Sequence, residues 1–192
     1  MLARHGESTL NVARVVNGDP AVDVRLTENG RRESQLLGRQ VRNVPLDLCL
    51  VTRFGRTRET AELALEGRAV PLVVEPLFDD IDIGDLEGSS LDEYRDWKRA
   101  HSRADPFPNG ESLDAAAARY GRGLESLLAR PERTILVVTH EIPVRYALNA
   151  AEGSRDPDSP HRAIANATPY LFGEETLAEA AARLLDGARR LA

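Results

Sequence analysis

Two histidines follow strand-like segments that lie far apart in the chain. His5 belongs to the segment Arg-His-Gly-Glu-Ser at positions 4–8, and His140 follows the apolar run 135–139. Parallel strands deliver the residues at their carboxyl ends to one edge of an open α/β sheet, where ligands bind, so both imidazoles can share one site. The guanidinium of Arg4 beside His5 matches the oxygens of a phosphate group. These residues indicate a site for an anionic substrate.

Short apolar runs rich in β-branched residues alternate with longer segments of helical periodicity, which predicts an α/β fold. We expect strands over residues 46–52, 70–75 and 134–139, and helices over 28–41, 56–66, 111–130 and 174–191. Thr27 is the expected N-cap of the first of these helices. A further helix around Trp97 lies within residues 79–107, which we interpret as an insertion over the site. Only three residues precede Arg4, so the first strand is unusually short.

Composition restricts the class of protein. A chain of 192 residues fits one domain, residues 1–192, and its net charge of −6 argues against a nucleic-acid surface, which needs clustered Lys and Arg. The one cysteine, Cys49, excludes an internal disulfide and favours a reducing cytoplasm. No basic and apolar N-terminal segment is present, and no apolar run approaches the roughly 18 residues of a membrane span. We expect a cytoplasmic, unexported protein that acts on small molecules, with no nucleic-acid or membrane partner.

Several segments in a fixed order resemble the histidine phosphatase superfamily, also called phosphoglycerate mutase-like. They are segment 4–8 with Asn11, Arg-Thr-Arg-Glu-Thr-Ala at 56–61, Gly-Asp-Leu-Glu-Gly at 84–88, Gly-Glu-Ser at 110–112 with Arg119, and Thr-His at 139–140. The resemblance spans roughly residues 1–172 and favours the phosphatase branch. It implies a three-layer sandwich in which a mostly parallel central sheet lies between helices.

The resemblance also implies roles for individual residues. His5 is the expected nucleophile, which would form a phosphohistidine intermediate. Arg4, Arg56 and His140 would surround the transferring phosphoryl group, and a protonated His140 would be the most useful form there. Asn11 is expected either to bind the phosphate or substrate or to stabilise its loop.

The departing alkoxide needs a proton, and the matching position for the general acid is Asp80. It lies four residues before Gly84, where phosphatases of the family usually have Glu. Asp79, Asp82 and Glu87 are its rivals, and a solvated acidic turn is the structural alternative. For the phosphate-binding arginine, Arg53 and Arg58 compete with Arg56.

The sequence departs from the family pattern at several positions. Thr-Arg at 52–53 replaces the usual Ser-Pro pair, Glu-Ile-Pro at 141–143 replaces two glycines after His140, and the C-terminal segment is helical where many relatives end in a strand. Glu141 could narrow specificity in this position.

We predict a phosphatase that hydrolyses small phosphate monoesters. The alternatives are a cofactor-dependent phosphoglycerate mutase, although such mutases are usually longer, and a catalytically inactive protein that binds phosphorylated ligands. His101 and His161 show no metal-ligand spacing with the other histidines, so no metal and no cofactor is implied. The expected partner is a small phosphorylated metabolite of unidentified kind. The oligomeric state stays open, with a homodimer among the options.

Overall fold

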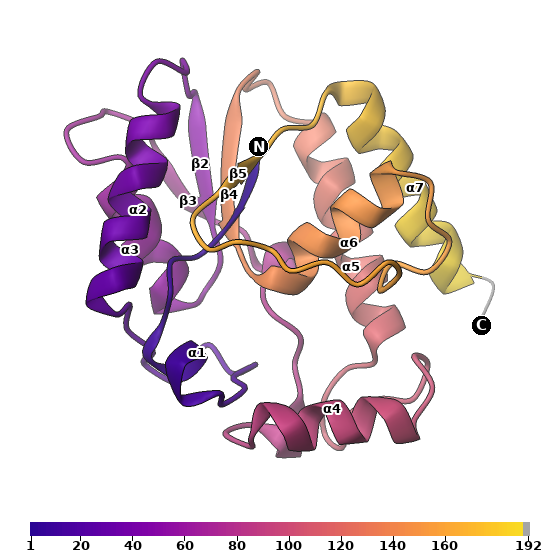
Figure 1. The fold of residues 1–192 in the computed structure, drawn as a ribbon. Coiled ribbons are helices and arrows are strands. Elements are labelled where there is room, and N and C mark those ends of the chain that lie inside the picture. The colour runs from indigo at the N-terminus through magenta and orange to yellow at the C-terminus, as the bar shows by residue number, and fades with distance from the viewer. Residues whose placement is uncertain (190–192) are drawn as a thin grey trace.

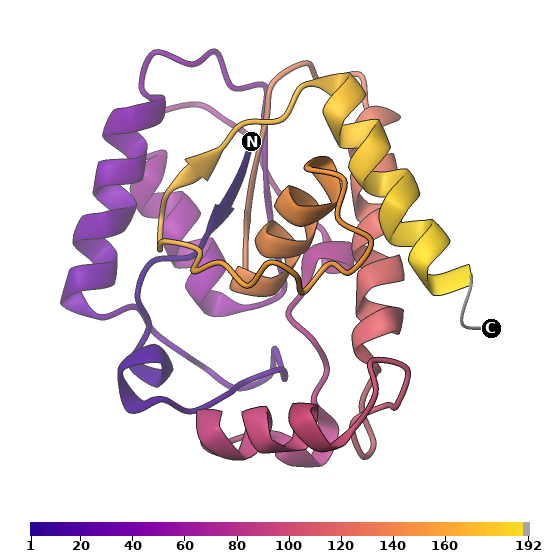
Figure 2. The same ribbon diagram turned by 45° about the vertical axis from the view of Figure 1, so that its right-hand side comes forward.

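Residues 1–189 are described by the structure, a computed structural model, in which helices cover both faces of a five-stranded sheet (Figures 1 and 2). The strands are β1 (Leu2–Arg4), β2 (Leu48–Val51), β3 (Leu72–Val74), β4 (Ile135–Thr139) and β5 (Pro169–Tyr170), in the spatial order β3-β2-β4-β1-β5. The β1–β4, β2–β4 and β2–β3 pairs are parallel, whereas β5 runs antiparallel to β1. The predicted three-layer α/β architecture is confirmed.

Alternation of apolar side chains along the central strands builds a core on each side of the sheet. In β2, Leu48 and Leu50 belong to the cluster that includes α5 (Leu113–Leu128), α6 (Glu141–Ala151) and α7 (Glu174–Arg189). Cys49 and Val51 belong to the cluster with α2 (Glu28–Val41) and α3 (Gly55–Ala64). All four residues are less than 4 % exposed, as expected for a parallel strand that is covered on both faces. The helices on either side therefore fix the sheet edge at which the strands end.

The helices mostly occupy the predicted segments. They are α1 (Thr9–Ala13), α2 (Glu28–Val41), α3 (Gly55–Ala64), α4 (Leu91–Ala100), α5 (Leu113–Leu128), α6 (Glu141–Ala151) and α7 (Glu174–Arg189). Thr27 caps α2 as predicted, because its hydroxyl accepts a hydrogen bond from the N–H of Gly30 at 3.0 Å. The prediction for α7 extended to Leu191, which lies outside the described residues.

Helices α1 and α6 and strand β5 were not expected from the sequence. Helix α6 begins directly after His140 and holds Pro143 in its first turn. Proline is tolerated there because N–H groups of the first turn have no acceptor within the helix. The tripeptide after His140 is therefore the beginning of a helix and not a phosphate-facing loop.

Helices α1 and α4 lie beyond the carboxyl ends of β1 and β4 in both views (Figures 1 and 2). Helix α4 belongs to the segment 79–107, which leaves the sheet after β3 and returns at α5. Two short 3-10 helices, Pro76–Phe78 and Gly84–Leu86, lie on this path. Within residues 1–189, no helix has the length and apolar character that a bilayer crossing requires.

Candidate active site

The carboxyl ends of β1, β2 and β4 bring two imidazoles and a guanidinium together. His5 follows β1, His140 follows β4, and Arg56 lies in the first turn of α3, which follows β2. The N–H of His5 donates to the Thr139 carbonyl at 2.9 Å, which ties the two strand ends together. The imidazole rings meet edge to face, with centroids 5.5 Å apart. All three side chains are buried, at 4 % exposure or less.

Hydrogen bonds fix the tautomer of His5. Its Nδ1 lies 2.7 Å from the Gly6 carbonyl oxygen, which can only accept, so Nδ1 carries the proton. Its Nε2 lies 3.1 Å from Nε of Arg56, which can only donate, so Nε2 keeps its lone pair. Burial first, and then the charges of Arg56 and Arg4, hold the pKa of His5 well below its usual value. His5 is therefore a neutral imidazole whose Nε2 is free of a proton.

The loop that carries His5 packs closely against α2 and α3. The N–H of Gly6 donates to the Thr60 hydroxyl at 3.0 Å, one turn beyond Arg56 in α3. A Cβ atom on Gly6 would lie 2.4 Å from the carbonyl oxygen of Gly30 in α2. Only glycine permits this approach. The spacing between Arg56 and Thr60 thus allows one helix to contact both His5 and the loop that carries it.

His140 is held by β2 and α3. Its Nε2 lies 3.0 Å from the Thr52 hydroxyl, its Nδ1 lies 3.2 Å from Nη2 of Arg56, and its ring meets Phe54 edge to face at 4.6 Å. Since Arg56 only donates, Nδ1 accepts and Nε2 is the protonated nitrogen. Burial, followed by the charges of Arg56 and His5, lowers the pKa of His140 well below its usual value. His140 is neutral in this arrangement. A phosphate dianion beside it would raise its pKa and favour the protonated form.

Asp80 lies beside the same guanidinium. Its Oδ2 is 3.3 Å from Nη2 of Arg56 and 3.4 Å from Nδ1 of His140, and its Oδ1 accepts from the N–H of Ile81 at 3.1 Å. The side chain keeps 24 % of its surface exposed. Burial raises the pKa of Asp80, while Arg56 opposes that rise. A carboxyl group with a raised pKa next to the phosphoryl-binding groups is suited to proton transfer.

The three rival carboxylates have other partners. Asp79 is buried and binds the backbone N–H and the guanidinium of Arg53. Asp82 accepts from the N–H of Gly84 at 3.0 Å. Glu87 accepts from the Asn17 amide and from the backbone N–H groups of the two residues after Asn17. The geometry therefore places Asp80, and none of the three rivals, in contact with Arg56 and His140.

The other arginines proposed for phosphate binding differ in position. Arg53 and Arg58 have side chains more than half exposed and pair with Asp79 and Glu62, so neither competes with Arg56. Arg4 lines the cavity and pairs with Glu141 at 3.0 Å, while its Nη1 also donates to the Ile164 carbonyl at 2.9 Å.

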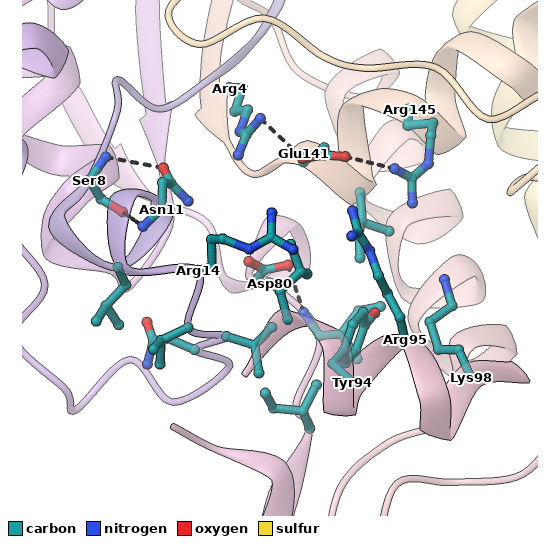
Figure 3. A pocket seen from close by; sticks show the side chains of 18 of the residues that line it. Arg4, Ser8, Asn11, Arg14, Asp80, Tyr94, Arg95, Lys98, Glu141 and Arg145 are labelled. Carbon is teal, nitrogen blue, oxygen red and sulfur yellow. Dashed lines mark hydrogen bonds and ion pairs between the residues drawn. The ribbon is translucent and has the colours of Figure 1, made fainter. Parts of the chain in front are cut away.

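Asn11 has a local structural role and also lines the cavity. Its side-chain oxygen accepts from the N–H of Ser8 at 3.0 Å, and the Ser8 hydroxyl accepts from the N–H of Asn11 at 3.3 Å, which forms a capping box on α1 (Figure 3). Asn11 and Arg4 both line the cavity. Of the two predicted roles, stabilisation of the loop is observed.

Two site residues were missed by the sequence analysis. The side-chain oxygen of Asn17 accepts from Nη1 of Arg56, and Glu87 in turn accepts from the Asn17 amide at 2.7 Å. The hydroxyl of Thr52 orients His140. The Gly-Asp-Leu-Glu-Gly segment was a signal for Glu87, but no local pattern marks Asn17.

A cavity of about 590 Å³ opens from these groups toward α1 and α4 (Figure 3). That volume lies within the range of small-molecule sites. No group of three or more His, Cys, Asp or Glu side chains within the described part of the chain could hold a metal ion. The arrangement can bind an anion, supply an imidazole nucleophile and transfer a proton through a carboxyl group.

Comparison with known proteins places this chain in a family. The model of the histidine phosphatase superfamily (branch 1) matches residues 1–189. A probable phosphoglycerate mutase GpmB from Erwinia tasmaniensis is 32 % identical over 147 residues, which cover 72 % of this chain and 67 % of that protein. The GpmB protein from Yersinia pestis is 29 % identical, with 79 % and 74 % covered.

Solved structures share the fold. The α-ribazole phosphatase from Shigella flexneri superposes with a TM-score of 0.76 at 26 % identity, covering 86 % of this chain and 85 % of that one. Bacillus stearothermophilus YhfR superposes with a TM-score of 0.73 at 28 % identity, with 90 % and 86 % covered. These proteins are similar to this chain over most of its length.

Proposed function

Because this chain belongs to the histidine phosphatase superfamily (branch 1), we propose that it hydrolyses small phosphate monoesters through a phosphohistidine on His5. One observation carries the proposal: a neutral, buried imidazole presents an unprotonated Nε2 at 3.1 Å from Arg56. The proposed partner is a small phosphorylated metabolite. The proposed location is the cytoplasm, with which the free, buried thiol of Cys49 is compatible.

In the first step, the Nε2 lone pair of His5 attacks phosphorus in line with the ester oxygen. The P–N bond forms as the P–O bond breaks, and the proton held by Asp80 goes to the departing alkoxide. Arg4 and Arg56 would donate to the equatorial oxygens, and His140 would join them as a donor when the charge of the bound phosphate favours its protonated form, so that the developing charge is stabilised. The raised pKa of Asp80 supports the role of acid.

In the second step, a water attacks the phosphorus of phosphohistidine and the P–N bond breaks. The electron pair returns to Nε2 of His5, and the proton of the water goes to the Asp80 carboxylate, which restores the acid. Inorganic phosphate then leaves. The Gly6 carbonyl, 2.7 Å from Nδ1, keeps the imidazole oriented during both steps.

A mutase is the second candidate, since the similar proteins from Erwinia tasmaniensis and Yersinia pestis are probable phosphoglycerate mutases. A mutase must keep water away from the phosphohistidine until an acceptor reacts. Asp80 keeps 24 % of its side chain exposed, so water can reach the group proposed as base. This exposure favours hydrolysis over return of the phosphoryl group.

The test combines a nucleophile variant with a trapping experiment. His5→Ala should lose phosphate release from nitrophenyl phosphate by several orders of magnitude, whereas His101→Ala, on an exposed residue, should keep it. Rapid quenching of the unsubstituted protein should give an acid-labile, base-stable phosphoryl label. Near-normal turnover by His5→Ala would refute the mechanism. A third outcome, binding of phosphate esters without turnover, would favour the inactive binding protein.

A second assay separates the two enzymatic candidates. With 3-phosphoglycerate and 2,3-bisphosphoglycerate supplied together, a phosphatase releases free phosphate faster than it interconverts the isomers. Rapid interconversion with negligible phosphate release would establish the mutase and leave His5, Arg4 and Arg56 in the same roles.

A further inference from the structure

The half of the cavity beyond Asp80 has a chemistry that phosphate binding does not require. Its lining between the phosphoryl end and α4 includes apolar side chains, among them Val16, Ile83 and Leu91. Val16 and Leu91 pack on the main core cluster, and Ile83 is 4 % exposed. A phosphate group alone would leave this surface uncovered, so the lining fits an apolar or aromatic portion of a ligand.

Two arginines border the far end of the cavity with one carboxylate between them. Nη2 of Arg14 lies 3.0 Å from Oδ1 of Asp92, and Nη1 of Arg95 lies 3.6 Å from the same oxygen. Asp92 is 71 % exposed and does not line the cavity, so these pairs are weak and the two guanidinium groups carry an excess of positive charge. Figure 3 shows both side chains reaching into the space that Asp80 faces.

Lys98 and Arg145 also line the cavity, but their charges are balanced differently. Lys98 lies 3.5 Å from Asp158, and Arg145 pairs with Asp158 and Glu141 at 3.1 and 2.8 Å. These carboxylates line the cavity themselves and offset the positive charge of both residues. Arg99 also lines the cavity, and its partner Asp96 does not, so the surplus charge lies at Arg14, Arg95 and Arg99.

The backbone of Arg14 adds a second observation. Arg14 ends α1 in the left-handed region, with φ 56°, where helix ends usually have Gly or Asn. A non-glycine residue in this region is uncommon, and such conformations concentrate at ligand sites. Arg14 thus occupies a position whose backbone conformation favours glycine or asparagine.

Tyr94 supplies a third observation. This residue of α4 lines the cavity and is 8 % exposed, and its hydroxyl is buried with no hydrogen-bond partner among residues 1–189. Buried hydroxyl groups are normally paired, so an unpaired hydroxyl on a residue that lines the cavity leaves a donor available to a polar atom of a ligand. The Tyr94 ring stacks on Phe107 with centroids 5.6 Å apart, which fixes the direction of the hydroxyl.

We propose that the half of the cavity beyond Asp80 binds the alcohol portion of the substrate, and that this substrate is a phosphate monoester with an apolar or aromatic body ending in a second anionic group. The second anion would pair with Arg14 and Arg95, and a polar atom of the body would accept from Tyr94. This inference rests on the proposed function of His5 as the group that receives the phosphoryl. A short three-carbon phospho-acid would leave the apolar lining uncovered.

The test uses esters that differ only at the far end. Phenylpropyl phosphate is compared with its para-carboxyl, para-phosphate and para-aminomethyl derivatives, and the two acidic derivatives separate a carboxylate from a second phosphate as the preferred anion. We expect kcat/KM for an acidic derivative to exceed that of the neutral ester by about five- to tenfold, the size of one or two exposed ion pairs. The aminomethyl derivative should be the poorest substrate.

Variants of the lining residues test which side chains cause the preference for an acidic ester. Arg14→Gln combined with Arg95→Gln should remove the preference for the acidic ester and leave kcat/KM for the neutral ester within about twofold. Arg32→Gln, on an exposed residue of α2 outside the cavity, is the matched control and should keep the preference. Tyr94→Phe should lower kcat/KM for esters with an acceptor on the body and leave inhibition by inorganic phosphate unchanged.

A binding measurement keeps this inference separate from the proposed function. Calorimetry with the corresponding non-hydrolysable phosphonates on His5→Ala measures the same preference without turnover. Equal affinity for neutral and acidic phosphonates, or a preference that survives in the double variant, would overturn the inference. If the acidic phosphonates bind more tightly but no ester is hydrolysed by the unsubstituted protein, the proposed catalysis fails and the anionic subsite stands.

Discussion

Replacing Gly6 with alanine tests whether the close packing of the nucleophile loop sets the rate. The new Cβ would lie 2.4 Å from the Gly30 carbonyl oxygen and 2.8 Å from the Ser34 hydroxyl, whereas ordinary van der Waals contact begins at 3.4 Å. The carbonyl oxygen belongs to the backbone of α2 and cannot rotate away. The difference, 3.4 minus 2.4, requires the loop to move by 1.0 Å.

That displacement acts directly on the nucleophile. The Gly6 carbonyl orients Nδ1 of His5, and the Gly6 N–H donates to Thr60 in α3, so a shift of the loop changes the direction of Nε2. A misplacement of about 1 Å costs about a hundredfold in rate, which corresponds to about 2.7 kcal/mol in the barrier. Overpacking of this kind costs about 1–3 kcal/mol in the free energy of unfolding.

The assay measures kcat for release of phosphate from nitrophenyl phosphate, with a thermal unfolding curve for each variant. Gly55→Ala is the matched control, because a Cβ there would meet its nearest atom, a carboxylate oxygen of Asp23, at 3.6 Å, although Gly55 adjoins Arg56. Its kcat should stay within about twofold. Gly30→Ala, whose Cβ would lie 2.0 Å from the Glu7 carbonyl oxygen, approaches the same loop from the other side and should resemble Gly6→Ala. The reasoning is refuted if Gly6→Ala keeps its kcat within about twofold of the unsubstituted protein.

Three further predictions follow from the charges of the site. Because the pKa of His5 is lowered and that of Asp80 is raised, kcat/KM should be highest below neutral pH. Asp80→Asn should remove the fall of kcat/KM at alkaline pH. A fall that persists in this variant would assign the acid to another residue. The folded state keeps His5 and His140 neutral while the unfolded chain protonates them below about pH 6.5, so the free energy of unfolding should fall on acidification from pH 7 by up to about 1.4 kcal/mol per pH unit for each histidine. Urea titrations between pH 5 and 7 measure this slope, and an unchanged slope in His140→Gln would contradict it. Finally, Glu141→Gln removes the carboxylate that pairs with Arg4 at 3.0 Å and should lower the inhibition constant of inorganic phosphate by about three- to fivefold, whereas weaker inhibition would show that Glu141 positions the guanidinium productively.

The elements that were predicted from the sequence are those in which a single pattern decides the structure. Helix α2 has an N-cap, a 3.6-residue apolar period and an amphipathic face, and its observed bounds are those predicted. Strand β2 is an apolar run between polar residues. Helix α6 has no such signal, because its N-cap residue, His140, makes no side-chain capping bond and Pro143 suggests a break. Strand β5 consists of two residues whose pairing with β1 depends on tertiary structure.

The site was predictable where the chemistry requires a particular residue type. His5 and His140 could be expected together because strand ends converge, and Arg56 was implied by the family resemblance. The structure places Arg56 within hydrogen-bond distance of both histidines. Asn17 and Thr52 could not be found in this way. Asn17 reaches Arg56 only because Glu87, 70 residues further along the chain, holds its amide, and such a long-range contact leaves no local pattern.

Asp80 shows how distant residues can make a shorter side chain effective. The resemblance implies Glu at this position, yet the aspartate reaches both Arg56 and His140. Arg119 of α5 donates to the carbonyl oxygens of Asp79 and Asp80 at 2.9 and 3.2 Å, and Glu111 pairs with the same guanidinium. These bonds hold the backbone of the acidic turn in place. The carboxyl group of Asp80 therefore reaches Arg56 and His140 without a longer side chain. The segment Gly-Glu-Ser at 110–112 and Arg119 therefore contribute to the site through the backbone that carries Asp80.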